Sequence, residues 1–432
     1  MFPKLSTVYR ASIPNLYVIQ FAGEIVTSRP RFSNKYNKYH ARMPNYNSSL
    51  LRVTLPSLTS FTNHHRELIE SAVNNTYKCL VIYVSCKDID LCKKSPLKFW
   101  DKVNNLLNTF YVSGTKTSYK LSRPFLEIEV IFENWCGYSV ELEREWEFEV
   151  FFGNNLGKNI VTFPALYRSI LFSCNLLIEF MNIERPTLEK FNKNRKAAEL
   201  TELPIHVIDT ITPPSPQIIT NHHDPIDKLD DDKPQVHPNV AVGGTFDHLH
   251  VGHKILLTMS AWITNKRLIC GVTGDSMLTN KKYKEYMEPI DVRIAEAKRF
   301  LNIIRRGLLY EVVPIYDIYG PTITDPDIQA LVVSKETVSG AYSSMSPSPT
   351  RLFLPTASLK FSYKPPSIRF DLVNEERKNR GLNPLEISVI EVISSSDSSL
   401  KDEEFKKLKL SSTFIREMLS KNNGKSREKY DQ

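Results

Sequence analysis

The chain has 432 residues, of which 41% are hydrophobic and 24% charged, and a net charge of +8. This length predicts two or more globular domains. No apolar run approaches the roughly 18–20 residues that span a bilayer. Six cysteines without a CxxC pair do not form the disulfide framework of a small secreted domain. We therefore expect a cytoplasmic protein with reduced thiols and no transmembrane segment.

The first part of the chain is basic. Residues 1–66 carry Glu24 as their only acid. An acid-poor start that contains serine is one feature of mitochondrial transit peptides, so mitochondrial association is the alternative location. Residues 16–19 look more like a strand than an amphipathic helix, however. Because no nucleic-acid-binding motif accompanies the basic residues, we predict a basic domain edge and no nucleic-acid partner.

The residues before 209 predict a smaller α/β domain, 1–208, with its own core. Apolar runs predict strands at 80–84, 126–131 and 145–152, and helices at 99–107 and 166–180. We recognise no phosphate loop, metal-ligand spacing or nucleophile constellation in this domain. Its role does not follow from the sequence.

A segment rich in proline and aspartate separates this domain from the rest of the chain. Between 209 and 238, six prolines interrupt any regular element, and Asp230, Asp231 and Asp232 repel one another. Such a stretch buries too little apolar surface to offset the entropy of ordering it, so we predict a linker.

The C-terminal part, 239–420, alternates regularly between strands and helices. Strand-like runs occur at 239–242, 268–272, 310–315, 330–333 and 387–392, with helical patterns between them. We predict an α/β fold, a doubly wound parallel Rossmann-like sheet with its ligand crevice at the carboxyl ends of the strands. A serine- and proline-rich stretch at 343–366 predicts an inserted loop. Residues 421–432 look like a solvated tail.

The stretch from Gly243 to His253 lies where the first of these strands gives way to a helix. It reads Gly-Gly-Thr-Phe-Asp-His-Leu-His-Val-Gly-His. Glycines let the backbone approach a ligand closely, and a helix start offers free N–H groups and a positive dipole end. The sequence therefore predicts a phosphate site for nucleotide chemistry at this turn.

The run from Gly244 to Asp247, followed by His250 to His253, resembles the signature of the nucleotidyltransferase superfamily, which shares a (T/H)xGH motif. Within that superfamily the chain looks like the phosphopantetheine adenylyltransferases of the archaeal and eukaryotic type. Further matching segments follow in the family's order, at 319–321, 325–326, 332–337, 381–387 and 411–416. The resemblance covers under half of the chain. It implies transfer of AMP from ATP to 4′-phosphopantetheine, with Mg²⁺ as cofactor.

The resemblance gives the two motif histidines catalytic roles. His253 is expected to contact the α-phosphate of ATP, and His250 to support the ATP phosphates. A plainer interpretation is a pair of surface histidines at a helix start. Together with His248 they could also bind zinc, but no carboxylate or thiolate stands at matching spacing, so we predict no metal ligands.

Residues on either side of the motif complete the expected phosphate site. Gly243 and Gly244 allow close backbone approach, and Thr245 falls where the family binds the acceptor's phosphate. Lys281 or Lys282, in the loop after the second strand, is expected to bridge that phosphate and ATP. The alternative for the lysines is a solvated charge cluster.

Ser411, Ser412 and Thr413 precede an amphipathic helix that carries Arg416. Hydroxyls at a helix start cap free N–H groups, which alone explains them. The resemblance implies that this run, with Arg416, binds the β- and γ-phosphates of ATP. The two interpretations are compatible, because a helix start also binds anions.

The acceptor pocket is harder to assign. Tyr319 and Gly320 are expected to shape it, with Ser334 and Lys335 after the fourth strand. Bacterial members have an arginine-rich segment at that place. Their acceptor contacts therefore do not carry over to this chain.

Three other functions compete with this assignment. A cytidylyltransferase shares the GTFDxxHxGH beginning, but it ends with an RTxGIST-like run rather than residues 411–416. A class I aminoacyl-tRNA synthetase needs a KMSKS-like loop, for which residues 281–286 are a poor substitute. A catalytically dead scaffold is the third; the intact Thr245, His250 and His253 count against it.

The mammalian relatives are fused to a dephospho-CoA kinase with a GxxxxGK(S/T) loop. Gly424-Lys425-Ser426 lacks the upstream glycine of that loop, so a monofunctional, fungal-like form is expected. Its product would need a separate kinase. Other enzymes of the coenzyme A pathway are therefore plausible partners, besides the substrates ATP and 4′-phosphopantetheine.

Overall fold

The computed structural model describes residues 8–10, 17–21, 24–28, 45–154, 184–208, 210, 236–334, 368–390 and 411–427. The chain forms two compact units, Met1–Arg42 and Met43–Gln432. The first unit holds an antiparallel sheet of β1 (Val8–Arg10), β2 (Tyr17–Phe21) and β3 (Glu24–Ser28). The strand predicted near residues 16–19 is confirmed as β2.

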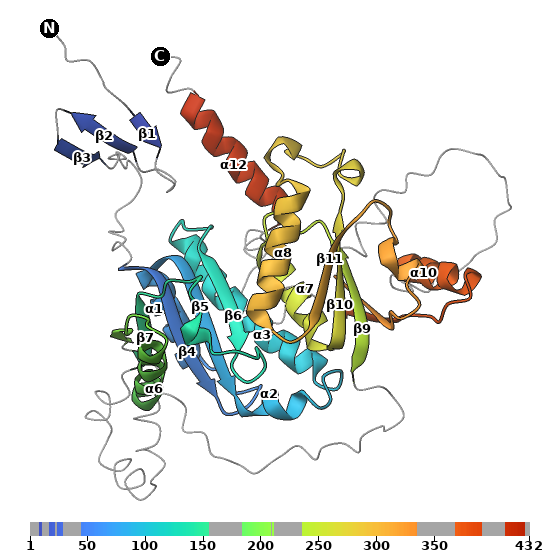
Figure 1. Cartoon of the computed structure of the whole chain (residues 1–432), viewed down its shortest axis with the longest axis horizontal. Helices are drawn as coiled ribbons and strands as arrows, with labels where there is room; N and C mark the ends of the chain where they lie inside the picture. Colours follow the sequence, from blue (N-terminus) through green and yellow to red (C-terminus); the bar gives the residue numbers. More distant parts are fainter. Residues whose placement is uncertain are drawn as a thin grey trace, which may run out of the picture. The chain divides into compact units, whose positions relative to one another are not determined.

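The second unit contains two five-stranded parallel sheets (Figure 1). The N-terminal sheet has the order β6-β5-β4-β7-β8. Its strands are β4 (Tyr46–Leu55), β5 (Thr76–Cys86), β6 (Glu127–Phe132), β7 (Val150–Asn154) and β8 (Ile205–Ile208). Its helices are α1 (Asn63–Asn75), α2 (Lys87–Cys92), α3 (Trp100–Lys120) and α6 (Glu184–Ala197). Apolar side chains of α1 and α3 pack on one face of the sheet, and those of α6 pack on the other.

Most predictions for this sheet are confirmed, and one is wrong. The strands at 80–84 and 126–131 and the helix at 99–107 are present. The strand predicted at 145–152 begins only at Val150. Trp146 and Phe148 have the apolar pattern of a strand and reach the core, but they do so from an irregular segment before it. Strands β4 and β8 and helices α1, α2 and α6 were not predicted. The helix predicted at 166–180 lies outside the described residues.

The C-terminal sheet has the order β11-β10-β9-β12-β13 and confirms the predicted doubly wound parallel fold. Its strands are β9 (His237–Gly244), β10 (Thr264–Thr273), β11 (Leu309–Ile315), β12 (Ala330–Ser334) and β13 (Glu386–Ile390). Its helices are α7 (Val251–Trp262), α8 (Ile290–Ile304), α10 (Ile368–Asn379) and α12 (Ser412–Arg427).

Three short 3₁₀ turns, η3 (Asp275–Met277), η4 (Lys284–Tyr286) and η5 (Gly320–Ile323), lie in the loops after β10 and β11. The insert predicted at 343–366, and nearly all of the linker predicted at 209–238, lie outside the described residues. Helix α12 continues to Arg427, so the beginning of the tail predicted at 421–432 is helical, supported by an ion pair between Lys421 and Glu417 one turn apart. Among the described residues, no helix is both long and apolar enough to cross a membrane.

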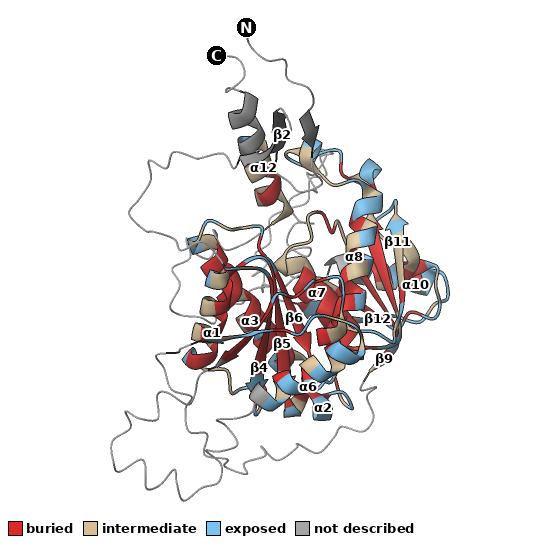
Figure 2. Ribbon diagram, turned by 60° about the vertical axis from the view of Figure 1, so that its left-hand side comes forward, coloured by how far each residue is buried: buried red, intermediate tan, exposed pale blue. Residues whose placement is uncertain are grey.

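The two sheets share one hydrophobic core. Helix α7 is buried from Lys254 to Trp262, and its apolar residues belong to the same cluster as those of α1 and α3 (Figure 2). A helix that is apolar all round needs partners on every side. The indole Nε1 of Trp262 donates to the carbonyl of Pro96 at 3.0 Å, and its ring packs against Trp135. The N-terminal sheet therefore forms part of the environment that α7 requires.

A buried ion pair crosses this core. Lys254, in the first turn of α7, donates from Nζ to Oε1 of Glu129 at 2.8 Å and to the carbonyl of Ile128 at 3.1 Å. Glu129, on β6, is fully buried, and its burial raises the pKa of its carboxyl group while Lys254 lowers it. Both charges depend on each other, because neither reaches water.

We predict that breaking this pair destabilises the whole second unit. Removal of one partner leaves a buried charge without compensation, which typically costs about 3–5 kcal/mol. Glu129→Gln should therefore lower the free energy of unfolding far more than Glu376→Gln, which breaks the exposed pair between Arg380 and Glu376. Urea titration of both variants measures the difference. Equal losses would show that the buried pair does not hold the two sheets together.

Candidate active site

The site begins where β9 ends and α7 starts. Gly243 and Gly244 close the strand, and His250 caps the helix by accepting a hydrogen bond on Nδ1 from the N–H of Gly252 at 3.2 Å. Between them, Phe246 and His248 adopt positive φ angles of 49° and 46°. Residues other than glycine rarely adopt this backbone conformation, so the surrounding contacts must impose it.

The two motif histidines lie face to face. The rings of His250 and His253 stack with centroids 3.8 Å apart, and Phe246 packs behind His253 at 5.3 Å. Since Nδ1 of His250 accepts a hydrogen bond, its proton in the neutral form is on Nε2. Among the described residues, the buried Nδ1 of His253 has no hydrogen-bond partner. Each ring thus keeps a polar atom that a ligand can use.

Both imidazoles are neutral in the free protein. Burial lowers the pKa of His253 from the ordinary 6.5 to about 3. The pKa of His250 is also well below its usual range, first because of burial and then because of the neighbouring His253, His248 and Lys254. A neutral imidazole donates one hydrogen bond without needing a counter-charge. An arriving phosphate would favour the protonated forms and raise both pKa values.

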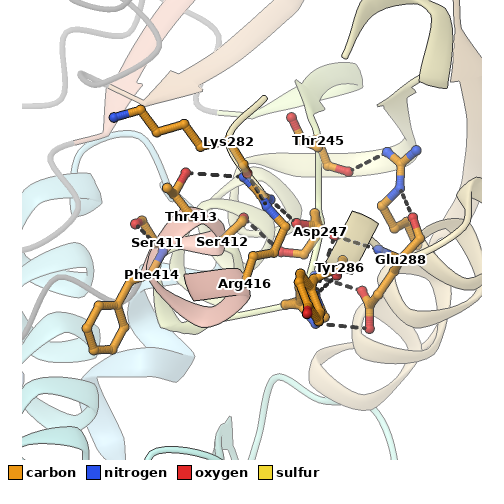
Figure 3. Close-up of polar contacts among 12 residues, drawn as sticks. Thr245, Asp247, Lys282, Tyr286, Glu288, Ser411, Ser412, Thr413, Phe414 and Arg416 are labelled. Atoms are coloured by element: carbon orange, nitrogen blue, oxygen red, sulfur yellow. Dashed lines mark hydrogen bonds and ion pairs between the residues drawn. The ribbon is translucent and has the colours of Figure 1, made fainter. Parts of the chain in front are cut away.

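Asp247 holds the loop in its unusual conformation. Its fully buried carboxylate accepts from the N–H of Glu288 at 2.9 Å through Oδ1 and pairs with Arg416 of α12 through Oδ2. Its carbonyl accepts from the hydroxyl of Ser412 at 2.8 Å. Figure 3 shows the start of α12 against the loop that carries Asp247. One residue therefore joins the turn after β9, the loop after β10 and helix α12.

Arg416 connects the same three segments through its guanidinium group. Arg416 is 1% exposed; its Nε donates to the carbonyl of Lys282 at 3.0 Å, and its Nη2 donates to the hydroxyl of Thr413 at 3.2 Å. With Nη1 on Asp247, all three nitrogens bond within the protein. This placement favours a positioning role, and the predicted phosphate contact of Arg416 stays a prediction.

A second buried arginine, Arg293 of α8, was missed by the sequence reasoning. It donates to the carbonyls of Thr245 at 2.9 Å, Thr273 at 2.8 Å and Glu288 at 3.0 Å, and to the carboxylate of Asp275 at 2.5 Å. These bonds clamp the loops after β9 and β10 together. The available signal was its place on the apolar face of α8, where an arginine needs buried acceptors.

The other predicted phosphate ligands border the same turn. Lys281 and Lys282 are exposed in the loop after β10. Ser411 caps α12 by accepting from the N–H of Phe414 at 3.3 Å, and Ser412 and Thr413 form the first turn. The bond from Ser412 to the carbonyl of Asp247 brings this helix start to the loop between β9 and α7, residues 245–250, which we call the histidine loop.

The predicted acceptor residues lie at the same edge of the sheet, because the carboxyl ends of parallel strands share one edge. Ser334 ends β12, and Tyr319 precedes η5 after β11. The N–H groups of Tyr319 and Gly320 donate to Asp317 at 2.8 and 2.6 Å. Gly320 has a φ of +51°, and a Cβ there would meet Ile315 at 2.7 Å, so the turn requires glycine. Lys335 lies outside the described residues.

In the part of the chain that the structure describes, no three histidine, cysteine, aspartate or glutamate side chains are grouped as they would be around a metal ion. His248 contributes instead to the loop, with its N–H donating to Glu288 at 2.7 Å and its Nε2 bonding to the carbonyl of Tyr286 at 2.8 Å.

Comparison with known proteins agrees with this geometry. A family model described as cytidylyltransferase-like matches residues 241–418, which include the histidine loop and the start of α12. An uncharacterized protein of Schizosaccharomyces pombe is 32% identical over 346 residues, 79% of this chain and 86% of that protein. A phosphopantetheine adenylyltransferase of Pyrobaculum aerophilum is 31% identical, over 42% of this chain and 92% of its own length. The chain belongs to the cytidylyltransferase-like nucleotidyltransferases.

A Saccharomyces cerevisiae phosphopantetheine adenylyltransferase is 41% identical over 179 residues, 41% of this chain and 48% of the yeast protein. The chain thus spans about half of that relative. The matched residues, 241–418, include the stacked histidines at the carboxyl edge of the C-terminal sheet.

We predict that the imidazole of His253 stays neutral in mildly acidic solution. With a pKa of about 3, its ring carbon signal in a ¹³C-labelled protein should not move between about pH 8 and 5.5, whereas an ordinary histidine titrates there. The signal is assigned by its loss in His253→Gln. Because the unfolded chain takes up this proton near the ordinary pKa of 6.5, His253 also makes the fold less stable as the pH falls below that value. A midpoint near 6.5 in the folded protein would contradict the burial argument.

Proposed function

We propose that this nucleotidyltransferase is a phosphopantetheine adenylyltransferase. It transfers AMP from ATP to 4′-phosphopantetheine and releases pyrophosphate and 3′-dephospho-CoA. The stacked pair of His250 and His253 beside Gly243-Gly244-Thr245 carries the proposal, since it lies at a helix start, where backbone N–H groups and the helix dipole favour a phosphate. The yeast and Pyrobaculum relatives that bear this name support the choice of nucleotide and acceptor.

The reaction needs position and charge stabilisation more than covalent help. An oxygen of the acceptor phosphate forms a bond to the α-phosphorus of ATP, and the bond from that phosphorus to the pyrophosphate oxygen breaks in line with it. Negative charge then accumulates on the oxygens around the α-phosphorus. A preorganised donor that points at those oxygens lowers the barrier.

His253 is the proposed donor to the α-phosphate, and His250 supports it. Stacking on His250 and packing against Phe246 fix the ring of His253, so little reorganisation is needed when the charge develops. Thr245 is proposed to bind the acceptor phosphate. Arg293 holds the Thr245 carbonyl at 2.9 Å, which fixes the backbone of that residue.

The start of α12 is proposed to bind the β- and γ-phosphates. Its first N–H groups lack a carbonyl partner one turn back in the helix, and the helix dipole favours anions there. Mg²⁺ enters as part of the MgATP substrate, and one of Lys281 and Lys282 is proposed to approach the phosphates from the exposed loop.

The competing function is transfer of CMP from CTP to a phosphorylated alcohol, which the description of the matched family keeps open. The two functions differ in the base of the nucleotide and in the acceptor. The product of the proposed reaction still lacks the 3′-phosphate of coenzyme A, so a kinase must follow. Association with other enzymes of coenzyme A synthesis stays a prediction.

We expect the full-length chain to release pyrophosphate from MgATP only when 4′-phosphopantetheine is present. Mass spectrometry should show 3′-dephospho-CoA in equal amount. Replacing ATP with CTP, or the acceptor with a phosphorylated alcohol, should remove the signal. Pyrophosphate release with CTP and a phosphorylated alcohol, but not with ATP and 4′-phosphopantetheine, would assign the chain to the competing function. No release with either nucleotide would identify a catalytically dead scaffold.

We expect His253→Ala to lower kcat on the order of 10²-fold, the usual effect of removing one donor to a developing oxyanion. A matched control is His206→Ala on β8 of the N-terminal sheet, whose Nδ1 bonds to the hydroxyl of Tyr46. Circular dichroism of both variants separates loss of catalysis from loss of fold. An unchanged kcat in folded His253→Ala protein would remove this histidine from the mechanism.

A further inference from the structure

The two parallel sheets have the same strand order and the same register. In each, the first strand along the chain lies in the centre, the next two follow on one side, and the last two on the other. In the N-terminal sheet, Ser49 lies opposite Leu80 and Val150; in the C-terminal sheet, Val240 lies opposite Leu268 and Ala330. This order alone is common among doubly wound folds. The pairings nevertheless give a residue-by-residue correspondence.

Side-chain details that the strand order does not require also recur. Asn192 of α6 donates to the carbonyl of Leu203 at 3.0 Å and accepts from its N–H at 2.8 Å. Asn374 of α10 makes the same two bonds to Leu385, at 3.1 and 2.8 Å. In both domains an asparagine of the helix before the last strand thus holds the chain just ahead of that strand.

An arginine follows each asparagine at the same distance along its helix. The Nε of Arg195 and the Nε of Arg377 each donate at 2.6 Å to a carbonyl six residues further on. The turn between arginine and carbonyl holds a residue of positive φ in both cases, Glu199 at 58° and Gly381 at 70°. Glycine is the usual residue for this conformation, so the glutamate indicates that the turn geometry has been kept against its residue preference.

The start of the first helix corresponds as well. Thr62 precedes α1 as His250 precedes α7, and His65 and His253 are both the third residue of their helix. Thr62-Asn63-His64-His65 therefore occupies the place of the HxGH motif. The superfamily motif (T/H)xGH also begins with threonine in some members, so only its glycine is replaced.

We infer that the described residues 45–154 and 184–208 form a second copy of the nucleotidyltransferase fold, whose phosphate crevice is closed by its own side chains. Three observations support the duplication: the correspondence of the strands, the matching hydrogen bonds of the asparagines and arginines, and the position of Thr62 and His65 at the start of α1. This part of the inference does not depend on which nucleotide or acceptor the C-terminal domain uses.

The crevice of the N-terminal copy is closed by side chains near the carboxyl ends of β4 and β5. In the C-terminal sheet, Gly243 lies opposite Gly271 and leaves the backbone open. The corresponding residues of the N-terminal sheet are Arg52 and Tyr83, which lie opposite each other and are both buried. Arg52 donates to Glu133 at 2.8 Å. Large side chains thus occupy the place where a phosphate could approach the backbone.

The histidine of the N-terminal copy is also engaged by its own chain. Nδ1 of His65 accepts from the N–H of Thr62 at 3.0 Å. Burial and the nearby His64 lower the pKa of His65 to about 4, and a hydrogen bond with the backbone of Thr54 offsets a part of this. Nδ1 of His253, in contrast, has no partner among the described residues. The two copies have divided their tasks: the C-terminal one keeps the open site, and the N-terminal one supports α7 through the shared core.

Equilibrium dialysis of the full-length chain against labelled ATP tests this inference. We expect one ATP per chain at saturation. His65→Gln should bind ATP with a Kd within about twofold of the parent chain, whereas the matched His253→Gln, at the same helix position, should weaken binding about tenfold, the effect of one lost hydrogen bond to a charged group. Glutamine fills a similar volume at both positions but has no aromatic ring to stack on His250, so its amide is not held where the imidazole of His253 lies. Circular dichroism confirms the fold.

Two ATP molecules per chain would overturn the closed crevice. So would loss of ATP binding in folded His65→Gln protein together with unchanged binding in His253→Gln. A folded chain that binds no ATP at all would contradict the proposed function of the C-terminal domain, while the N-terminal crevice would still be closed as inferred. The two failures are therefore distinguishable.

Discussion

The buried pair of Asp247 and Arg416 is the contact on which the site depends. It joins a loop that would not hold its positive φ angles alone to a helix that begins far away in the sequence. Because both side chains lie out of reach of water, loss of either would leave a charge that nothing else neutralises. The same carboxylate also fixes the loop after β10 through Glu288. The three segments that we propose to surround the triphosphate of ATP are thereby already assembled in the free protein.

Preassembly explains the state of the histidines. Burial keeps His250 and His253 neutral, and the cap and the stacking keep their rings in place. A site of neutral donors and helix starts binds a polyanion without carrying a strong positive charge when it is empty. In the proposed reaction, the exposed lysines of the loop after β10 add positive charge when the phosphates bind.

The N-terminal copy supports helix α7, which carries His253. Helix α7 is buried on all sides because the C-terminal sheet covers one part of it and the elements of the N-terminal sheet cover another. Lys254, the residue directly after His253, pairs with Glu129 of the other sheet. The position of the histidine loop therefore depends on residues of both sheets, although only one sheet carries the open crevice.

The sequence predicted the C-terminal fold well, because its buried strands are continuous apolar runs and its glycines mark the turn. It missed β4, since Ser48, Ser49 and Arg52 interrupt the apolar pattern although all three are buried. It also missed Arg293 and the pairing of Arg416 with Asp247. These contacts join residues far apart in the chain, and periodicity reports only local structure. The duplication could not be detected from the sequence for the same reason. The two copies share strand register and hydrogen-bond geometry, which join distant residues, more than they share residue identity.

The central claim is that the triphosphate of ATP lies between the His250–His253 stack and the start of α12. A crystal structure of the full-length chain with a non-hydrolysable ATP analogue tests it most directly. The account predicts the α-phosphate within hydrogen-bond distance of His253 and the outer phosphates on the first N–H groups of α12. Phosphates bound away from both, or at the start of α1, would contradict it.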